Sequence, residues 1–236
     1  MKKITLKGAR MLACAALFTA VASLTAFSFA DNAAVSLQSG ESYSPYYHGD
    51  RSKACVAIMI NVYENSDIVC KMVDFLTEAG AKATFFVGGC WADDNTETLK
   101  KIAESGMEIG NHGYFHKDCK KISAADCERE IVTNHTLIKQ ILNVEMKLFA
   151  PPSGSYDVST LKIAEKLGYK TIMWSKDTID WRDGDVDTLV KRATEKYENG
   201  DMILMHPKPH SLTALKRIVD FYKKNNVETL TVSEII

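Results

Sequence analysis

The chain has 236 residues, of which 46% are hydrophobic and 25% are charged, and this composition is typical of a soluble globular protein. Its 5 prolines and 13 glycines are too few for a collagen-like or low-complexity chain. The formal net charge of −1 argues against a nucleic-acid partner, because proteins that bind nucleic acid usually carry a basic excess.

The first 30 residues have the pattern of an export signal peptide. A basic start precedes an uncharged, alanine-rich run over residues 11–30, and Ser28 and Ala30 place small side chains where a signal peptidase reads them. An uncleaved membrane anchor is the alternative, because about 20 apolar residues can span a bilayer. In both cases we expect the rest of the chain to be secreted or extracytoplasmic, and to meet a membrane only through an uncleaved signal segment. Cleavage would leave a net charge of −5.

Residues 31–53 are polar and show no periodicity, which predicts a linker or a wrapping arm. Five cysteines follow residue 30, and an odd number argues against a disulfide scaffold. We expect Cys55 and Cys70 to be core cysteines, and a bridge between Cys119 and Cys127 is an arrangement that their spacing allows.

From residue 54 onward, short apolar runs alternate with amphipathic stretches. The expected strands cover 55–62, 82–87, 107–111, 147–150, 169–174, 201–206 and 227–232, and the expected helices cover 67–79, 95–105, 123–142, 157–167, 186–198 and 211–225. Glycines such as Gly80 and Gly168 stand between a helix pattern and the next strand, where a left-handed residue commonly ends a helix. Seven strands alternating with helices predict one α/β domain over residues 54–236, with a parallel sheet that is either doubly wound or barrel-like.

Polar residues mark the carboxyl ends of the expected strands. In β/α barrels this face carries the active site, so we favour a (β/α)7 barrel-like fold with one site. The residues that fall there are Asn61, Asn111, His112, Asp177, His206 and the turn over 151–154.

Several of these residues suit catalysis. His112 and His116 have a spacing at which two imidazoles can bind one metal ion, although two unrelated polar side chains would read the same. His206 ends an apolar strand, where it is either a core residue or a general acid with a suitable pKa. Asp177 follows the preceding strand, so we expect it to pair with His206 and orient it. Aromatic residues in the strand-end loops suit stacking on sugar rings or else pack the loops: Trp91, Tyr114, Tyr156 and Trp181.

Taken together, these residues resemble the polysaccharide deacetylase family, also called the NodB-homology domain or carbohydrate esterase family 4. The resemblance covers residues 54–236 and implies a distorted β/α barrel. The matching segments are Lys82 to Val87, Glu108 to His112, the His-x-x-x-His motif ending at His116, Pro151 to Gly154 for Arg-Pro-Pro-x-Gly, Asp177 to Trp181 for Asp-x-x-Asp-Trp, and Leu204 to His206 for Leu-x-His.

The resemblance implies a hydrolase that removes N-acetyl groups from glycan. In the family one Asp and two His hold a divalent metal, usually zinc, which activates water, while a second Asp is the base and the last His protonates the leaving amine. On this chain His112 and His116 match the two metal-binding histidines, and His206 matches the acid, for which we expect assistance from Asp177. Substrate contacts are expected from the motif residues Pro151, Pro152 and Gly154 and the aromatic Tyr156 and Trp181.

The first motif departs from the family. Where the family reads Thr-Phe-Asp-Asp-Gly, this chain reads Met-Ile-Asn-Val-Tyr over residues 59–63. Asn61 therefore stands at the position of the catalytic base, Val62 at that of a metal ligand, and Ala150 at that of the Arg that orients the base. Two histidines alone hold zinc weakly, so Glu64 or Asp67 is a candidate third ligand. Restoring the three family residues is expected to tighten zinc binding about tenfold or more.

Two hypotheses about function follow from these residues, beside a β/α protein of unrelated activity. The first is an exported deacetylase that acts on N-acetylated cell-envelope glycan of peptidoglycan or chitin type. The second is a catalytically impaired glycan-binding or morphogenetic protein on the same fold.

Overall fold

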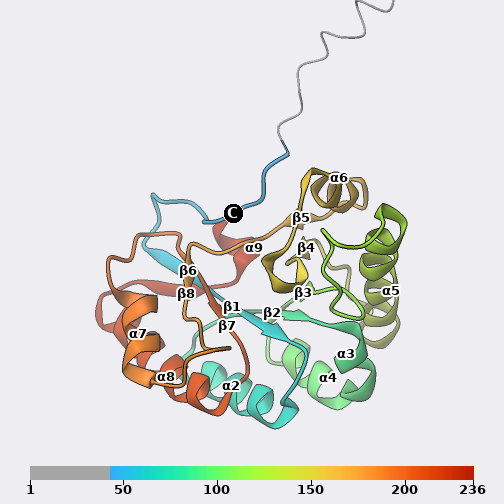
Figure 1. Ribbon diagram of the computed structural model, residues 1–236. Helices are drawn as coiled ribbons and strands as arrows, with labels where there is room; N and C mark the ends of the chain where they lie inside the picture. Colours follow the sequence, from blue (N-terminus) through green and yellow to red (C-terminus); the bar gives the residue numbers. More distant parts are fainter. Residues whose placement is uncertain (1–42) are drawn as a thin grey trace, which may run out of the picture. The chain divides into compact units, whose positions relative to one another are not determined.

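A curled parallel sheet forms the centre of residues 43–236, the part of the chain that the computed structural model describes (Figure 1). Its strands are β1 Cys55–Val62, β2 Thr84–Val87, β3 Glu108–Asn111, β4 Leu148–Phe149, β5 Lys170–Thr171, β6 Lys176–Asp177, β7 Met202–Met205 and β8 Glu228–Leu230. They are ordered β5-β4-β3-β2-β1-β7-β6, and β8 also pairs with β1. The predicted barrel-like α/β fold is confirmed, and β1 lies at its centre.

Strand β1 is buried along its whole length because both of its faces are covered. Val56, Ile58 and Ile60 belong to the large apolar cluster under the helices. Ala57 and Met59 point the other way, into a smaller cluster inside the curled sheet. Such two-sided burial explains why the strand reads as a continuous apolar run without polar alternation.

Helices cover the outer face of the sheet, whereas the short C-terminal helix contributes Val232 and Ile235 to the inner cluster (Figure 1). The helices are α2 Ser66–Ala79, α3 Gly89–Asp94, α4 Thr96–Glu104, α5 Ala124–Leu142, α6 Val158–Lys166, α7 Val186–Thr194, α8 Pro209–Lys224 and α9 Val232–Ile235, with a 3-10 turn η2 over Pro152–Gly154. Gly80 ends α2 in the left-handed region, with φ 67°, as its position predicted.

Short elements were the ones that the periodicity did not indicate. Strand β6 has only two residues and both are polar, and α3, η2 and α9 are too short to show a helical stripe. The strand expected over 169–174 is reduced to Lys170–Thr171. These missed elements matter here, because β6 and η2 both contribute side chains to the site described below.

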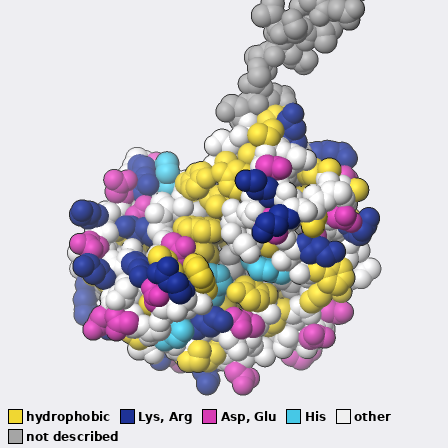
Figure 2. Space-filling model, in the orientation of Figure 1, with side chains coloured by type: hydrophobic (Ala, Val, Ile, Leu, Met, Phe, Trp, Pro, Cys, Tyr) yellow, Lys and Arg dark blue, Asp and Glu magenta, His cyan; other side chains and the backbone are white. Residues whose placement is uncertain are grey.

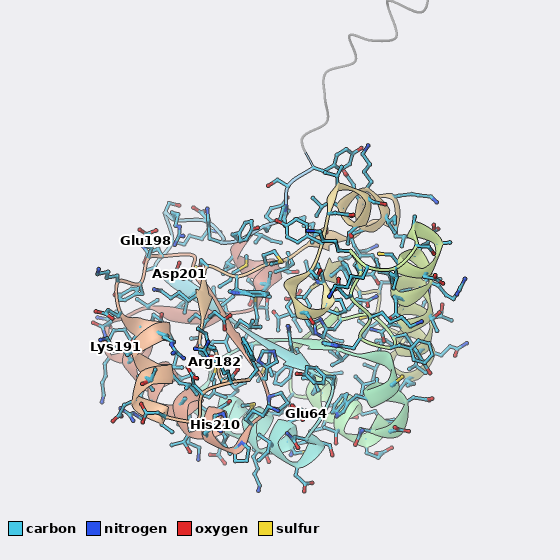
Figure 3. The ribbon with its side chains drawn as sticks, viewed as in Figure 1. Glu64, Arg182, Lys191, Glu198, Asp201 and His210 are labelled. Carbon is cyan, nitrogen blue, oxygen red and sulfur yellow. The ribbon has the colours of Figure 1, made fainter. Side chains whose placement is uncertain are left out.

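The described part of the predicted linker packs as an arm on the domain. Tyr46 forms an isolated parallel β-bridge with Ile172, and His48 forms an antiparallel β-bridge with Asp201. The Arg51 guanidinium lies 2.8 Å from Asp201 and 3.3 Å from Glu198, two residues labelled in Figure 3. The predicted signal peptide and the rest of the linker lie outside the described residues. Within residues 43–236, no helix is long and apolar enough to cross a membrane.

The cysteines in the described residues are free thiols. Cys119 and Cys127 are both buried and form no disulfide, and the Cys119 thiol donates to the carbonyl oxygen of Lys117 at 3.8 Å. The neighbouring Cys127 thiol, together with burial, raises the pKa of the Cys119 thiol. Cys55 is in the core as expected, whereas Cys70 is only partly buried.

We expect alkaline pH to destabilise the fold through Tyr169, whose pKa burial raises from 10.0 to about 12. The unfolded chain releases this proton first, so the free energy of unfolding falls as pH rises from about 10 to 12, by at most about 1.4 kcal/mol per pH unit. Tyr169→Phe should flatten this slope in urea unfolding at about pH 9, 10 and 11. Equal slopes for the two proteins would contradict the assignment.

Candidate active site

A pocket of about 340 Å³ opens where several strands end. Asn61 reaches it from β1, His112 directly follows β3, Asp177 ends β6 and His206 directly follows β7. Figure 2 shows histidine side chains among hydrophobic ones near the middle of this face. The structure therefore brings these four residues, which the sequence analysis placed at the carboxyl edge of the sheet, to one pocket at that edge. Its complete lining is Asn61, Tyr63, His112, His116, Ser153, Gly154, Trp174, Asp177, Trp181, Leu204 and His206.

His112 is buried, with one ring nitrogen fixed by the backbone. Its Nδ1 lies 2.7 Å from the carbonyl oxygen of Ala150, and because a carbonyl only accepts, Nδ1 carries the proton. Burial, with the neighbouring His116, lowers the pKa of His112 to about 3. The imidazole is therefore neutral near pH 7, and its Nε2 keeps a free lone pair.

His116 lies beside His112, with 4.9 Å between the ring centroids. Its backbone is left-handed, with φ 57°, and burial lowers the pKa of its imidazole. The turn that carries it is held by Glu130, whose carboxylate accepts the Phe115 N–H at 2.8 Å. Glu130 is itself buried. The sequence analysis missed it, although an acidic residue on the apolar stripe of the expected helix 123–142 was a usable signal.

His206 is paired with Asp180, and the expected pairing with Asp177 is wrong. The His206 Nδ1–H donates to Asp180 Oδ1 at 2.8 Å, and the His206 backbone N–H donates to Oδ2 at 2.7 Å. Ser211, in the first turn of α8, donates its hydroxyl to Asp180 Oδ2 at 2.6 Å. The Asp180 carboxylate is buried and fixes the orientation of the His206 ring through Nδ1, so Nε2 is the ring nitrogen that Asp180 leaves unengaged.

Asp177 lines the same pocket without bonding to His206. Its Oδ1 accepts the Ile179 N–H at 2.8 Å, which closes a turn after β6. Burial raises the pKa of this carboxyl group. Asp177 is the one acidic side chain in the pocket lining, so it remains a candidate for contact with a ligand.

Asn61 is the polar residue at the pocket end of β1. It is buried, and its Oδ1 has no hydrogen-bond partner among the described residues. A buried carboxamide of this kind is costly unless something pairs with it. A carboxamide cannot take a proton from water, so Asn61 cannot act as a general base.

Comparisons with known proteins agree with this geometry. A family model described as polysaccharide deacetylase matches residues 48–172. The chain belongs to the polysaccharide deacetylase family. It is 30% identical over 172 residues to a peptidoglycan-N-acetylglucosamine deacetylase of Bacillus cereus, a match that covers 70% of this chain and 80% of that protein.

Two further relatives are similar over most of this chain. The uncharacterized protein YlxY of Bacillus subtilis is 37% identical over 192 residues, which are 81% of this chain but only 60% of that protein. The structure of BA3943, a CE4 family pseudoenzyme from Bacillus anthracis, has a TM-score of 0.79 and 32% identity, and the match covers 82% of this chain and 69% of that one. A mutant of BA3943 with restored enzymatic activity is equally similar, with a TM-score of 0.79, 30% identity and coverage of 82% and 71%.

A zinc centre of the family type does not fit the residues present. His112 keeps the orientation of a metal-ligating histidine, but Val62 packs in the outer apolar cluster. Zinc sites use at least three protein ligands, and no group of three His, Cys, Asp or Glu residues in 43–236 is placed to hold a metal. Glu64, labelled in Figure 3, pairs with Lys208 and lines a separate cavity with Asp67. The expectation of a third ligand from Glu64 or Asp67 is therefore not met.

The substrate-contact predictions divide in two. Gly154 and Trp181 line the pocket, and Trp181 is exposed. Pro151 and Pro152 are buried and do not line it, and the Tyr156 hydroxyl is hydrogen-bonded to that of Tyr47 at 2.6 Å instead. The pocket gains four residues that the sequence analysis did not single out as contacts, namely Tyr63, Ser153, Trp174 and Leu204.

Proposed function

We propose that this chain is an extracytoplasmic member of the family that acts on N-acetylated cell-envelope glycan of peptidoglycan or chitin type, and that it binds this glycan without hydrolysing it efficiently. The observation that carries the proposal is Asn61. It stands in the pocket where the family has its base, and it cannot accept a proton from water. Export is supported by the signal-like residues 1–30, and the glycan class by the deacetylases among the relatives.

The pocket suits a sugar ring that carries an acetamido group. Tyr63, Trp174 and Trp181 give it aromatic walls, and such walls bind the apolar faces of sugars. The unpartnered carboxamide of Asn61 offers both a donor and an acceptor, which is what an amide ligand needs. Specific binding can therefore persist after the base and the metal ligand have been lost.

We expect Trp181→Ala to weaken binding of a tetramer of N-acetylglucosamine about tenfold, because the exposed indole at the pocket edge is removed. Isothermal titration calorimetry measures this affinity. The matched control is Tyr46→Ala, which removes another exposed aromatic ring outside the pocket and should leave the affinity unchanged. No measurable affinity of the unaltered chain for either chitin oligomers or peptidoglycan fragments would overturn the proposed function.

Deacetylation is a second candidate, favoured by the intact His206–Asp180 pair, which suits protonation of a leaving amine. In that case the cofactor would be a divalent metal, zinc by family resemblance, at His112 and His116. Metal content of the purified chain and acetate release from the same glycans test it. Stoichiometric metal together with sustained acetate release would favour this candidate over binding alone.

A further inference from the structure

Tyr63 lies among the three histidines of the pocket. Its ring centroid is 4.4 Å from that of His116, 6.4 Å from that of His112 and 6.2 Å from that of His206. In the described residues, no other aromatic side chain makes a ring–ring contact with more than one of these imidazoles. The phenol ring therefore occupies the middle of the histidine group.

The direction of Tyr63 follows from the regular course of β1. Val62 is still in register with Val87 of β2, and its side chain belongs to the outer apolar cluster with Ile60. Side chains alternate between the faces of a strand, so Asn61 points into the pocket and residue 63 is the next to do so. Both Asn61 and Tyr63 line the pocket, as this alternation requires.

A metal ion held by two imidazoles would lie about 2.0–2.1 Å from one nitrogen of each ring, and further ligands must reach it from the open side of the pair. The family motif has a glycine where this chain has Tyr63, so it leaves that side free of a ring. We propose that the Tyr63 ring fills the space in which a third metal ligand would have to lie, and that it thereby keeps the His112–His116 pair from holding zinc. The loss of metal binding is then built into the site at residue 63 as well as at residue 62.

A ligating side chain in place of the ring tests this directly. Tyr63→His supplies a third imidazole from the position that faces the pair, and we expect it to bind one zinc ion per chain about tenfold or more tightly than the unaltered protein. The matched control is Tyr63→Phe, which keeps the ring and should leave zinc affinity unchanged. Competition with a chromophoric chelator gives the affinity, and the visible absorption of bound cobalt(II) reports a tetrahedral site. Equal zinc affinity in the two variants would overturn the proposal.

A second comparison uses the family residues. The position of Tyr63 changes the expectation stated from the sequence. The set Asn61→Asp, Val62→Asp and Ala150→Arg should gain little zinc affinity while Tyr63 remains, and the gain of about tenfold or more should come only when Tyr63→Gly is added. Equal affinity with and without Tyr63→Gly would also overturn the proposal. Val62 is buried, so thermal unfolding must show that these variants fold; if they do not, the Tyr63→His and Tyr63→Phe pair decides alone. Zinc affinity is measured without glycan, so failure here leaves the glycan-binding proposal standing.

Discussion

Asp180→Ala is expected to lower the free energy of unfolding by about 3–5 kcal/mol, because it leaves buried hydrogen-bond donors without an acceptor. The carboxylate accepts three hydrogen bonds, two from His206 and one from Ser211, and it is almost fully buried. Within residues 43–236, none of these donors has a second acceptor at hydrogen-bonding distance. Urea unfolding at neutral pH measures the change in free energy.

Two variants calibrate this expectation. Asp180→Asn keeps the shape and one acceptor oxygen, so we expect it to lose about half as much free energy as Asp180→Ala. Asp187→Ala removes a carboxylate whose side chain is 80% exposed, and it should change the free energy of unfolding by about 0.5 kcal/mol or less. A loss of under about 1 kcal/mol for Asp180→Ala would show that the His206 pairing is not a buried structural bond.

The Asp180 network also shows where sequence reasoning reached its limit. The motif places Asp177 and Asp180 together after one expected strand, and the sequence analysis chose Asp177 as the partner of His206. The choice depends on a two-residue strand, β6, and on the turn in which the Asp177 Oδ1 accepts the Ile179 N–H, while Asp180 receives the bonds from His206. Features this short leave no periodic signal in a sequence.

The strand positions were predictable for a different reason. In β1 the apolar run is long and bounded, and the residues at its end are unusual for a buried strand, so both the strand and the site could be recognised. Tyr63 could not be recognised as part of the site in the same way. Its role depends on which face it points to, and that depends on β1 staying in register with β2 through Val62.

The motif around His112 also gave no indication of the buried polar residues that hold Asn111. The sequence singled out Asn111 and His112, but the residues that hold them come from elsewhere. Asn134 on α5 donates to the Asn111 Oδ1 at 2.9 Å, and Tyr169 accepts from the Asn111 Nδ2 at 3.2 Å. Nothing in the local sequence of the motif indicates these contacts, because they join segments that are 23 and 58 residues apart.

Asn111→Leu is expected to cost about 3–4 kcal/mol of unfolding free energy, although leucine has a similar size and suits a core. The Asn111 side chain makes four hydrogen bonds at the end of β3, and it is fully buried. In one of these bonds the Asn111 Oδ1 accepts the Gly113 N–H at 2.9 Å, which fixes the backbone on the far side of His112. Leucine would leave that N–H, the Ile131 carbonyl and the Asn134 amide short of a partner.

The matched control for this substitution is Asn225→Leu, at an exposed residue just after α8, which we expect to change the free energy of unfolding by about 0.5 kcal/mol or less. A double-mutant cycle with Asn134→Leu separates the network from simple loss of polarity. Because Asn111 and Asn134 share a hydrogen bond, the double variant should lose about 1 kcal/mol less unfolding free energy than the sum of the two single losses. Strict additivity would show that the two amides act independently, and that His112 is positioned by its bond to Ala150 without help from α5.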